Sequence, residues 1–567
     1  MIQAQIEQAL QAATLEHLPD ADSARILVRP CADPKHGDYQ SNALMGLAKQ
    51  RQMNPRQLAE RVVSSLEVSD WCEPIEIAGP GFLNFRLKAE ALRRALRAAI
   101  ESATPFVTPA LNPRTVVVDF SSPNVAKPMH VGHIRSTILG DTIARVLRLL
   151  GHQVITDNHI GDWGTQFGML LLGWKTDLDD RALAADPIAE LERLYKKVNA
   201  DEALRDAARA ELVKLQAGDP ENLAIWQRMI ALSQEQFDQV YGRLGINFDE
   251  TLGESFYNSQ LPGLVEELES QGIAEGSEGA KVVRFSGDKQ LVDKPAIVQK
   301  RDGAANYTTT DLATLRYRME TWSPTDIVYV TDGRQQLHFQ QIFNIFGRWK
   351  QGVPVRLEHV WFGSILGPDG KPFKTRSGDT VRLADLLDEA EDRALEVVSE
   401  KNPELTEDKR REIARVVGLG ALKYADLSNN RQSDYIFDWD KMLALQGNTA
   451  PYLQYAYTRV RSIFRKVDAP SFSTVELLLE APEEQALAKH LMNYGQALEM
   501  VAQDYRPNFL CNYLFELAGH FSRFYEACPV LKANEGERDS RLMLCELTAR
   551  VLRSGLDALG IEVTEVM

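Results

Sequence analysis

The chain has 567 residues, of which 44% are hydrophobic and 25% are charged, a composition typical of folded globular proteins and not of disordered ones. Its length predicts roughly three or four domains, and no stretch approaches the ~20 apolar residues that a membrane-spanning helix needs. The net charge of −16 excludes a broad basic coat for unspecific nucleic-acid binding, although local positive patches could still contact a specific RNA.

The beginning of the chain and its cysteines predict a cytoplasmic protein. The first residues, MIQAQIE, contain neither the basic region nor the apolar segment of a secretion signal. The five cysteines are scattered and include no C-x-x-C pair, so they suit neither a zinc site nor a disulfide framework. We therefore expect a reducing compartment, and no resident metal site.

The first part of the chain predicts a small α+β unit. Apolar spacing and Gly/Pro turns place its elements in this order: a helix from Ile2, a strand at Ile26–Val28, helices at Asn42–Ala48 and Pro55–Leu66, and a strand over Phe82–Leu87. Three prolines in close succession (Pro105, Pro109 and Pro113) then predict a linker.

The next part predicts a parallel sheet. The β-branched run Thr115–Phe120 is typical of a strand buried on both faces, and a helix over Ile134–Leu150 closed by Gly151 leads to a strand at Gln153–Thr156. A charged helical insertion spans about 174–277. Strand–helix alternation then resumes, with Asp326–Val330, a helix over Leu337–Trp349 and Val355–Val360, and from Leu386 onward the pattern is almost purely helical.

Two histidines lie at the start of the helix that follows the first parallel strand. His130 and His133 flank Gly132, where free N–H groups and the helix dipole favour a phosphate. The histidines can donate to an α-phosphate as its charge grows, and Gly132 permits close approach of a nucleotide. A lone H-x-G-H could also be a capped helix start or a metal site, but the 13-residue string behind a β-branched strand favours nucleotide chemistry.

This string resembles a known family. S-S-P-N-V-A-K-P-M-H-V-G-H, at 121–133, is followed by I-R-S-T-I-L-G-D and is similar to the HIGH signature of class I aminoacyl-tRNA synthetases in its arginyl form. The agreement continues over essentially the whole chain, at 157–168, 307–312, 335–338, 448–456 and 559–563.

The resemblance implies a three-part architecture and a reaction. The expected parts are an N-terminal α+β tRNA-contacting domain (1–108), a Rossmann-type catalytic α/β domain with the helical insertion (109–384), and an all-α stem and anticodon-binding domain (385–567). Arginine and ATP, with Mg²⁺ on its phosphates, would form arginyl-adenylate and pyrophosphate, and the arginyl group would pass to the 3′-terminal ribose of tRNA(Arg). We expect no tightly bound cofactor and a monomer.

The residues predict a pocket for arginine. Asp119 and Asn124 lie at the carboxyl edge of the sheet, where open α/β sheets bind ligands. Tyr307 and Asp311 are four apart and would share a helix face, the phenol as a wall and the carboxylate as a fork for the guanidinium. The resemblance assigns arginine binding to these four residues and to Gln335; Asp311 alone could equally be a helix-terminal charge.

The second signature loop of the class departs from its pattern. Where the class carries K-M-S-K, this chain has G-K-P-F-K-T-R-S-G at 370–378, with Lys371, Lys374 and Arg376 as its cations. We expect Lys374 and Arg376 to act in catalysis and Lys371 to bind ATP beside Gly132, His130 and His133; a solvated basic loop is the alternative. The resemblance suggests that Lys127 supplies the missing charge.

Two places are predicted to contact tRNA. In the last domain Tyr452, Tyr455 and Arg459 fall on one helix face with further polar and cationic residues, as base stacking and phosphate contact require. By pattern alone an ordinary amphipathic helix is as good an interpretation. Near the N-terminus, Phe82 and Asn84 could stack on and hydrogen-bond an unstacked base, or be plain strand residues.

Two other functions remain open from the residues. A small nucleotidyltransferase would share the H-x-G-H chemistry but would need neither the N-terminal unit nor the long helical end. A non-catalytic RNA-binding paralogue should have lost His130, His133 or the pocket acids, and the sequence retains them all.

Overall fold

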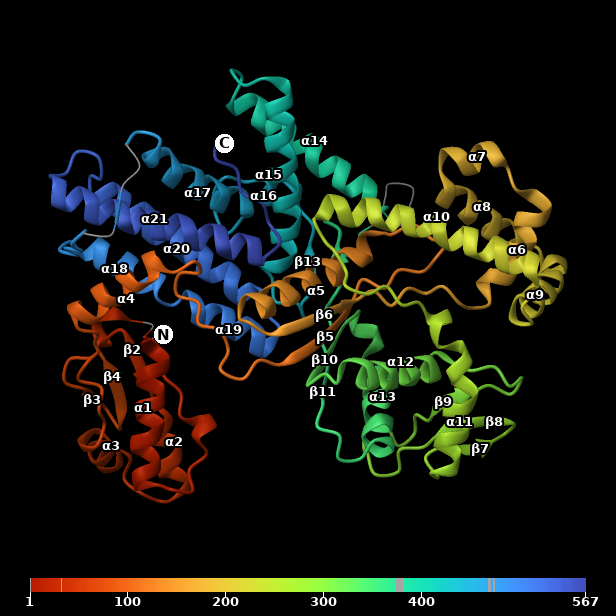
Figure 1. Ribbon diagram of the computed structural model, residues 1–567, viewed down its shortest axis with the longest axis horizontal. Coiled ribbons are helices and arrows are strands. Elements are labelled where there is room, and N and C mark those ends of the chain that lie inside the picture. Colours follow the sequence, from red (N-terminus) through yellow and green to blue (C-terminus); the bar gives the residue numbers. More distant parts are fainter. Residues whose placement is uncertain (1, 32, 374–380, 468–470, 473–474) are drawn as a thin grey trace.

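The computed structural model describes residues 2–31, 33–373, 381–467, 471–472 and 475–567. Figure 1 shows the parallel sheet near the centre, with the N-terminal elements beside the C-terminal helices. The first and last parts of the chain therefore pack against each other. In the described part of the chain, none of the helices combines the length and apolar content that crossing a bilayer requires.

The N-terminal unit is an antiparallel four-stranded sheet with helices, as predicted. Its strand order is β1-β2-β4-β3. Its elements are α1 (Ile2–His17), β1 (Arg29–Pro30), β2 (Tyr39–Ser41), α2 (Ala43–Gln50), α3 (Pro55–Ser64), β3 (Glu76–Ala78), β4 (Phe82–Phe85) and α4 (Ala89–Glu101). Pro55 occupies the first turn of α3, behind the N-cap Asn54. The predicted linker prolines lie in the irregular stretch after α4.

One predicted strand of this unit is wrong. Ile26 and Val28 are buried, but they belong to no strand, and pairing starts only at β1. The reason is that side chains satisfy this backbone: Gln3 donates to the Val28 carbonyl at 2.6 Å, and the Val28 N–H donates to Glu7 at 2.7 Å. A run of buried apolar side chains is therefore not sufficient to predict a hydrogen-bonded β-strand.

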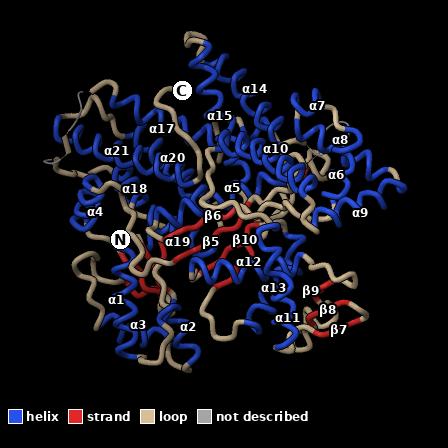
Figure 2. The backbone as a smooth tube through the Cα atoms, turned by 45° about the vertical axis from the view of Figure 1, so that its right-hand side comes forward, coloured by secondary structure: helices blue, strands red, loops and turns tan. Residues whose placement is uncertain are grey.

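The central sheet is parallel, with strand order β11-β10-β5-β6. Its strands, β5 (Thr115–Phe120), β6 (Gln153–Asp157), β10 (Asp326–Val330) and β11 (Arg356–His359), match the predicted ones closely, and Figure 2 shows β5, β6 and β10 at the centre of the molecule. After β5 the chain adds β6 on one side and later adds β10 on the other. The switch point between β5 and β10 is where such sheets bind ligands.

Both faces of the sheet are buried, as the β-branched run predicts. Val116 and Val118 belong to one apolar core with α5 (Val131–Leu149), while Val117 and Ile327 belong to a second core with the helices α12 (Tyr307–Trp322) and α13 (Gln336–Trp349). After α5, Gly151 takes a left-handed conformation with φ of +83°, which a glycine adopts without strain.

The remaining elements are the insertion and the helical end. The helices of the insertion and its continuation are α6 (Gln166–Asp177), α7 (Asp180–Ala185), α8 (Pro187–Ala200), α9 (Glu202–Gln216), α10 (Pro220–Leu244), α11 (Leu261–Ser270), α12 (Tyr307–Trp322) and α13 (Gln336–Trp349). A small antiparallel sheet joins β7 (Glu275–Ser277), β8 (Ala280–Val283) and β9 (Ala296–Gln299). The helical end comprises α14 (Leu383–Lys401), α15 (Glu407–Leu427), α16 (Trp439–Met442), α17 (Ala450–Phe464), α18 (Pro482–Leu491), α19 (Tyr494–Asp504), α20 (Asn508–Ala527) and α21 (Glu535–Ala558). The short strands β12 (Ile365–Leu366) and β13 (Tyr435–Ile436) pair in parallel and connect this end to the sheet domain.

Candidate active site

The two histidines form the N-terminal cap of α5. His130 is the N-cap residue, and its Nδ1 accepts a hydrogen bond from the Gly132 N–H at 3.0 Å. His133 reaches back, and its Nδ1 accepts from the His130 N–H at 3.1 Å. The two rings lie 4.0 Å apart. The cap therefore fixes both imidazoles at the edge of the sheet next to the switch point.

Burial sets the charge of the two imidazole rings, and these hydrogen bonds set which ring nitrogen carries the proton. Burial lowers the pKa of His133 to about 3, and burial with the neighbouring Arg334 and Lys127 lowers the pKa of His130. Both imidazoles are therefore neutral at pH 7. Because each Nδ1 accepts a backbone N–H, the single ring proton is on Nε2. Each histidine thus carries an Nε2–H donor without a formal charge.

The loop before α5 is strained. Ser121, Ser122 and Ala126 have φ values of 72°, 48° and 62°, a region that L-residues seldom adopt. Hydrogen bonds hold it: Ser122 N–H donates to the Asn158 Oδ1 at 3.0 Å, and the Ser121 hydroxyl lies 2.8 Å from the Tyr241 hydroxyl. Such strain is typical of functional loops.

Two cations, Lys127 and Arg334, lie close enough to His130 to lower its pKa. The exposed Lys127 lies over the Tyr195 ring, 5.8 Å from its centroid, and Lys371 is also exposed. Lys374 and Arg376 lie outside the described residues. Sequence reasoning missed Arg334, which is close enough to His130 to lower its pKa.

Arg334 and Gln335 belong to one short 3-10 turn, η4 (Gly333–Gln335), that follows β10. Arg334 makes two hydrogen bonds to the carboxylate of Asp332, at 2.8 and 2.9 Å, yet its side chain remains 88% exposed. Gln335 is exposed too. This turn therefore holds one cation and one amide at the carboxyl end of β10, both accessible to a ligand.

Tyr307 and Asp311 share a face of α12, as predicted. The exposed Tyr307 is the first residue of the helix, and its ring lies 4.8 Å from that of His338 on α13. His338 Nε2 lies 2.5 Å from the Asp311 Oδ2, so the histidine fixes the carboxylate. The helix has no acidic residue in its first turn, which speaks against a helix-terminal role for Asp311.

Asp119 lies just before the strained loop, and Asn124 lies within it. The Asp119 carboxylate is buried and accepts hydrogen bonds from the Ser122 hydroxyl at 3.1 Å and from Arg318 at 2.5 Å. Asn124 is exposed and lies against Gly161, where an added Cβ would come within 2.4 Å of the Asn124 Oδ1. Glycine at 161 thus makes room for the amide.

Asp119, Asp311 and Glu254 form an acidic region beside the buried Arg318. Burial raises the pKa of Tyr329 in β10, the charges of Asp119 and Asp311 add to that rise, and Arg318 opposes it. Burial, with the charges of Asp311 and Asp162, raises the pKa of Glu254 to about 7. Sequence reasoning missed Glu254, since no local pattern marks it.

The predicted tRNA-contacting residues are placed as follows. Phe82 is half-buried at the start of β4, and Asn84 is buried, with its Oδ1 accepting from Gln40 at 2.8 Å. The Asn84 Nδ2 has no protein partner in the described part of the chain. Because Asn84 is buried and Phe82 is half-buried, Phe82 is the more accessible of the two to an RNA base.

The outer face of α17 carries the other predicted residues. Tyr455 is exposed, while Tyr452 packs on Phe515 with ring centroids 5.7 Å apart. Arg459 lies over the Tyr525 ring, 4.5 Å from its centroid. Tyr455 therefore faces outward, whereas Tyr452 and Arg459 each pack against a neighbouring ring, and the tRNA contact of this face stays a prediction.

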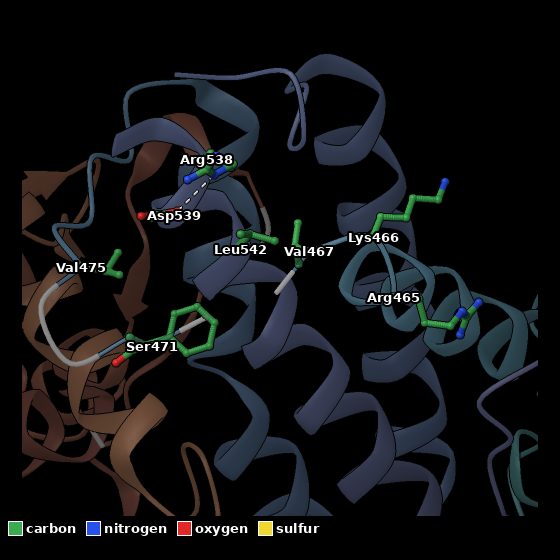
Figure 3. Close-up of a pocket in the computed structure, with 9 residues that line it drawn as sticks. Arg465, Lys466, Val467, Ser471, Val475, Arg538, Asp539 and Leu542 are labelled. Carbon is green, nitrogen blue, oxygen red and sulfur yellow. Dashed lines mark hydrogen bonds and ion pairs between the residues drawn. The ribbon is translucent and has the colours of Figure 1, made fainter. Parts of the chain in front are cut away.

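A surface cavity of about 680 Å³ lies beyond the end of α17. Figure 3 shows Arg465 and Lys466 at the end of α17 and the ion pair of Arg538 with Asp539 near the start of α21. The cavity lies far in sequence from the nucleotide motif, and its lining includes the cations Arg465, Lys466 and Arg538.

Three family models match consecutive parts of the chain. The class I (R) tRNA synthetase catalytic domain matches 98–439, the DALR anticodon binding domain matches 453–567, and the arginyl tRNA synthetase N terminal domain matches 1–87. The catalytic model covers more than half of the chain. With the parallel sheet and the H-x-G-H cap at its switch point, it defines a class I aminoacyl-tRNA synthetase.

Relatives narrow the class. An arginine–tRNA ligase of Laribacter hongkongensis is 47% identical over 561 residues, with 97% of each chain covered. One from Synechococcus elongatus is 47% identical and covers 100% of this chain and 99% of its own. The Thermus thermophilus arginyl-tRNA synthetase structure superposes with a TM-score of 0.86 at 28% identity, over 100% of both chains. The chain belongs to the arginyl-tRNA synthetase family.

Proposed function

We propose that the protein is an enzyme that joins arginine to tRNA(Arg). An arginine carboxylate oxygen attacks the α-phosphorus of ATP, the bond to pyrophosphate breaks, and arginyl-adenylate forms. A hydroxyl of the 3′-terminal ribose then attacks the arginyl carbonyl and releases AMP. The observation that carries the proposal is the pair of neutral Nε2–H donors at the start of α5, in a chain whose full-length relatives are arginine–tRNA ligases.

Catalysis would rest on positioning and charge stabilisation, because the attacking group belongs to the substrate. His130 and His133 donate to the α-phosphate, and Gly132 leaves room for it. Lys127 and Lys371, which are exposed in the structure, balance the triphosphate with Lys374 and Arg376. The arrangement needs no side-chain nucleophile.

Magnesium would arrive on the ATP phosphates. In the part of the chain that the structure describes, His, Cys, Asp and Glu form no cluster of three or more that could hold a metal ion. The ion's ligands would include phosphate oxygens and water, with at most one or two protein carboxylates, as is usual for Mg²⁺. The ion would neutralise negative charge on the phosphates during the displacement.

Arginine selection is assigned to the acidic region. Asp311, held by His338, would accept the guanidinium, and Tyr307 would pack against its flat face. Asp119 would support this end of the pocket, while Asn124 and Gln335, both exposed amides near the cap of α5, would hold the α-amine and carboxylate. A lysine ammonium offers a point charge and not a fork, so the pocket would discriminate against it.

tRNA recognition is assigned to both ends of the chain, through Phe82 and Asn84 near the N-terminus and Tyr452, Tyr455 and Arg459 on α17. We place the domain boundaries at 1–108, 109–384 and 385–567. We further propose a cytoplasmic monomer.

Arginine-dependent exchange of pyrophosphate into ATP, measured with and without tRNA(Arg), tests the proposal. We expect exchange with arginine, none with lysine, and charging of tRNA(Arg) with arginine. Binding of tRNA without exchange or charging would favour a non-catalytic RNA-binding paralogue. Exchange independent of any amino acid would favour a nucleotidyltransferase.

A further inference from the structure

The register of the parallel sheet aligns two buried carboxylates. Asp119 in β5 pairs with Asp157 in β6, and Tyr329 in β10 pairs with Asp119. Residues paired in a parallel sheet point to the same face, so the three side chains form a row at the carboxyl ends of the strands. Asp157 is fully buried, and 7% of the Asp119 side chain is exposed. Two buried carboxylates side by side repel each other and require a compensating charge.

Arg318 of α12 supplies this charge. Its side chain is fully buried, and its Nη2 donates to the Asp119 Oδ2 at 2.5 Å and to the Asp157 Oδ2 at 2.8 Å. Its Nε also donates to the Asp157 Oδ2, at 3.2 Å, and its guanidinium carbon lies 5.3 Å from the Tyr329 ring centroid. Burial raises the pKa of Asp157, and Arg318 opposes that rise.

The helix that carries Arg318 also carries the predicted substrate-binding side chains. Asp311 and Arg318 are seven residues apart, which places them on one face of α12 about 10 Å apart along its axis. The Arg318 Nη1 is buried and has no hydrogen-bond partner in the described part of the chain, and neither has the Asp157 Oδ1. The cluster of Arg318, Asp119 and Asp157 is therefore not saturated.

We propose that Arg318 is a positioning residue for arginine recognition, an inference that rests on the proposed function. Its guanidinium occupies the place between Asp119 and Asp157 that a free cation would otherwise take. It holds Asp119 in one orientation through Oδ2, while Oδ1, which accepts from the Ser122 hydroxyl at 3.1 Å, keeps a lone pair for the substrate. The substrate guanidinium is thereby directed to Asp311 and to the Oδ1 edge of Asp119.

Two substitutions test the role. Arg318→Met keeps the length of the side chain and removes its charge; Arg318→Lys keeps the charge and loses the fork. In arginine-dependent pyrophosphate exchange with tRNA present, we expect Arg318→Met to raise the arginine KM about 10- to 100-fold, because a displaced Asp119 would lose its charge-assisted hydrogen bond to the substrate guanidinium. The ATP KM should change by less than about threefold. Arg318→Lys should fall between the wild type and Arg318→Met.

A pH profile separates positioning from support of the fold. Burial raises the pKa of Asp157 and Arg318 opposes that rise, so the arginine KM of Arg318→Met should fall as pH rises from about 6 to 8 more steeply than in the wild type. Arg541→Met is the matched control, because Arg541 makes a largely buried pair with Glu484 at 2.7 Å between α21 and α18. It should lower the melting temperature without a selective change in the arginine KM.

The outcomes are distinct. A wild-type protein without arginine-dependent exchange would overturn the proposed function and this inference with it. An active wild type whose Arg318 variants keep the wild-type arginine KM and pH profile would overturn the inference alone. Should Arg318→Met fail to fold, the Arg318→Lys variant provides the test. If Arg318→Lys loses affinity for arginine and for ATP in parallel and has a lower melting temperature, Arg318 has a structural role only.

Discussion

Replacing Asp311 by Asn tests amino-acid selection most directly. The change keeps the shape of the side chain and removes its charge, and the amide oxygen can still accept from His338, whose Nε2 lies 2.5 Å from the Asp311 Oδ2. The packing of Tyr307 against His338, with ring centroids 4.8 Å apart, should persist. The variant therefore isolates the carboxylate charge that the substrate guanidinium is expected to meet.

The structure sets the size of the effect. Breaking a fully buried ion pair costs about 3–5 kcal/mol, but 23% of the Asp311 side chain is exposed, so solvent screens part of the interaction. A charge-assisted hydrogen bond in such a setting contributes about 2–3 kcal/mol. We therefore expect kcat/KM for arginine to fall about 30- to 150-fold.

Pyrophosphate exchange with varied arginine and varied ATP measures this effect. The ATP KM should barely change, and discrimination against lysine should narrow because the fork is lost. Asp179→Asn is a matched control, since Asp179 caps α7 by accepting from the Arg181 and Ala182 N–H groups, far from the pocket in sequence. An unchanged arginine KM and kcat in Asp311→Asn would refute the assignment and leave Asp311 as a helix charge.

Three further predictions follow. Alanine at His130 or His133 should slow adenylate formation about 10²–10³-fold, as for loss of one transition-state donor. The free energy of unfolding, measured by urea denaturation, should fall only by the ~1 kcal/mol of a lost helix cap. Equal losses of activity and stability would indicate that the histidines serve the core. Because burial raises the pKa of Glu254 to about 7 and a bound cation favours the ionised form, the arginine KM should fall as pH rises through 7. Glu254→Gln should abolish this slope, and a slope that survives would place the titration elsewhere. Arg459→Ala should weaken tRNA binding and reduce the salt slope by about one, whereas an unchanged slope would exclude a phosphate contact.

Local pattern was sufficient for the central sheet. The runs 115–120 and 326–330 are β-branched and apolar on both faces, and they form β5 and β10 with the predicted bounds. The same reasoning failed at Ile26–Val28, where the side chains of Gln3 and Glu7 bind the Val28 backbone that a neighbouring strand would otherwise bind. That competition involves residues some 20 positions away, so no window around the segment reveals it.

The candidate site was predictable where one segment carries it. The cap of α5 and the face shared by Tyr307 and Asp311 follow from spacing within a helix. The spacing of seven between Asp311 and Arg318 was a usable signal of the same kind. The role of Arg318, however, depends also on Asp157, which lies beside Asp119 because of the register between β5 and β6.

The two charged ends of the site explain why neutral histidines suit this reaction. The arginine carboxylate and the ATP phosphates are both anions, so bringing them together needs cations at the phosphates and acids at the far end of the amino acid. Beyond the effect of burial, Arg334 and Lys127 lower the pKa of His130, and Asp311 raises the pKa of Glu254, so cations lie near the histidines and acids near Glu254. A charged imidazole would bind ground-state phosphate tightly before any reaction, whereas a neutral Nε2–H donor gains most as charge accumulates on the α-phosphate. The Nδ1 acceptor bonds of the helix cap are thus what make each histidine a donor.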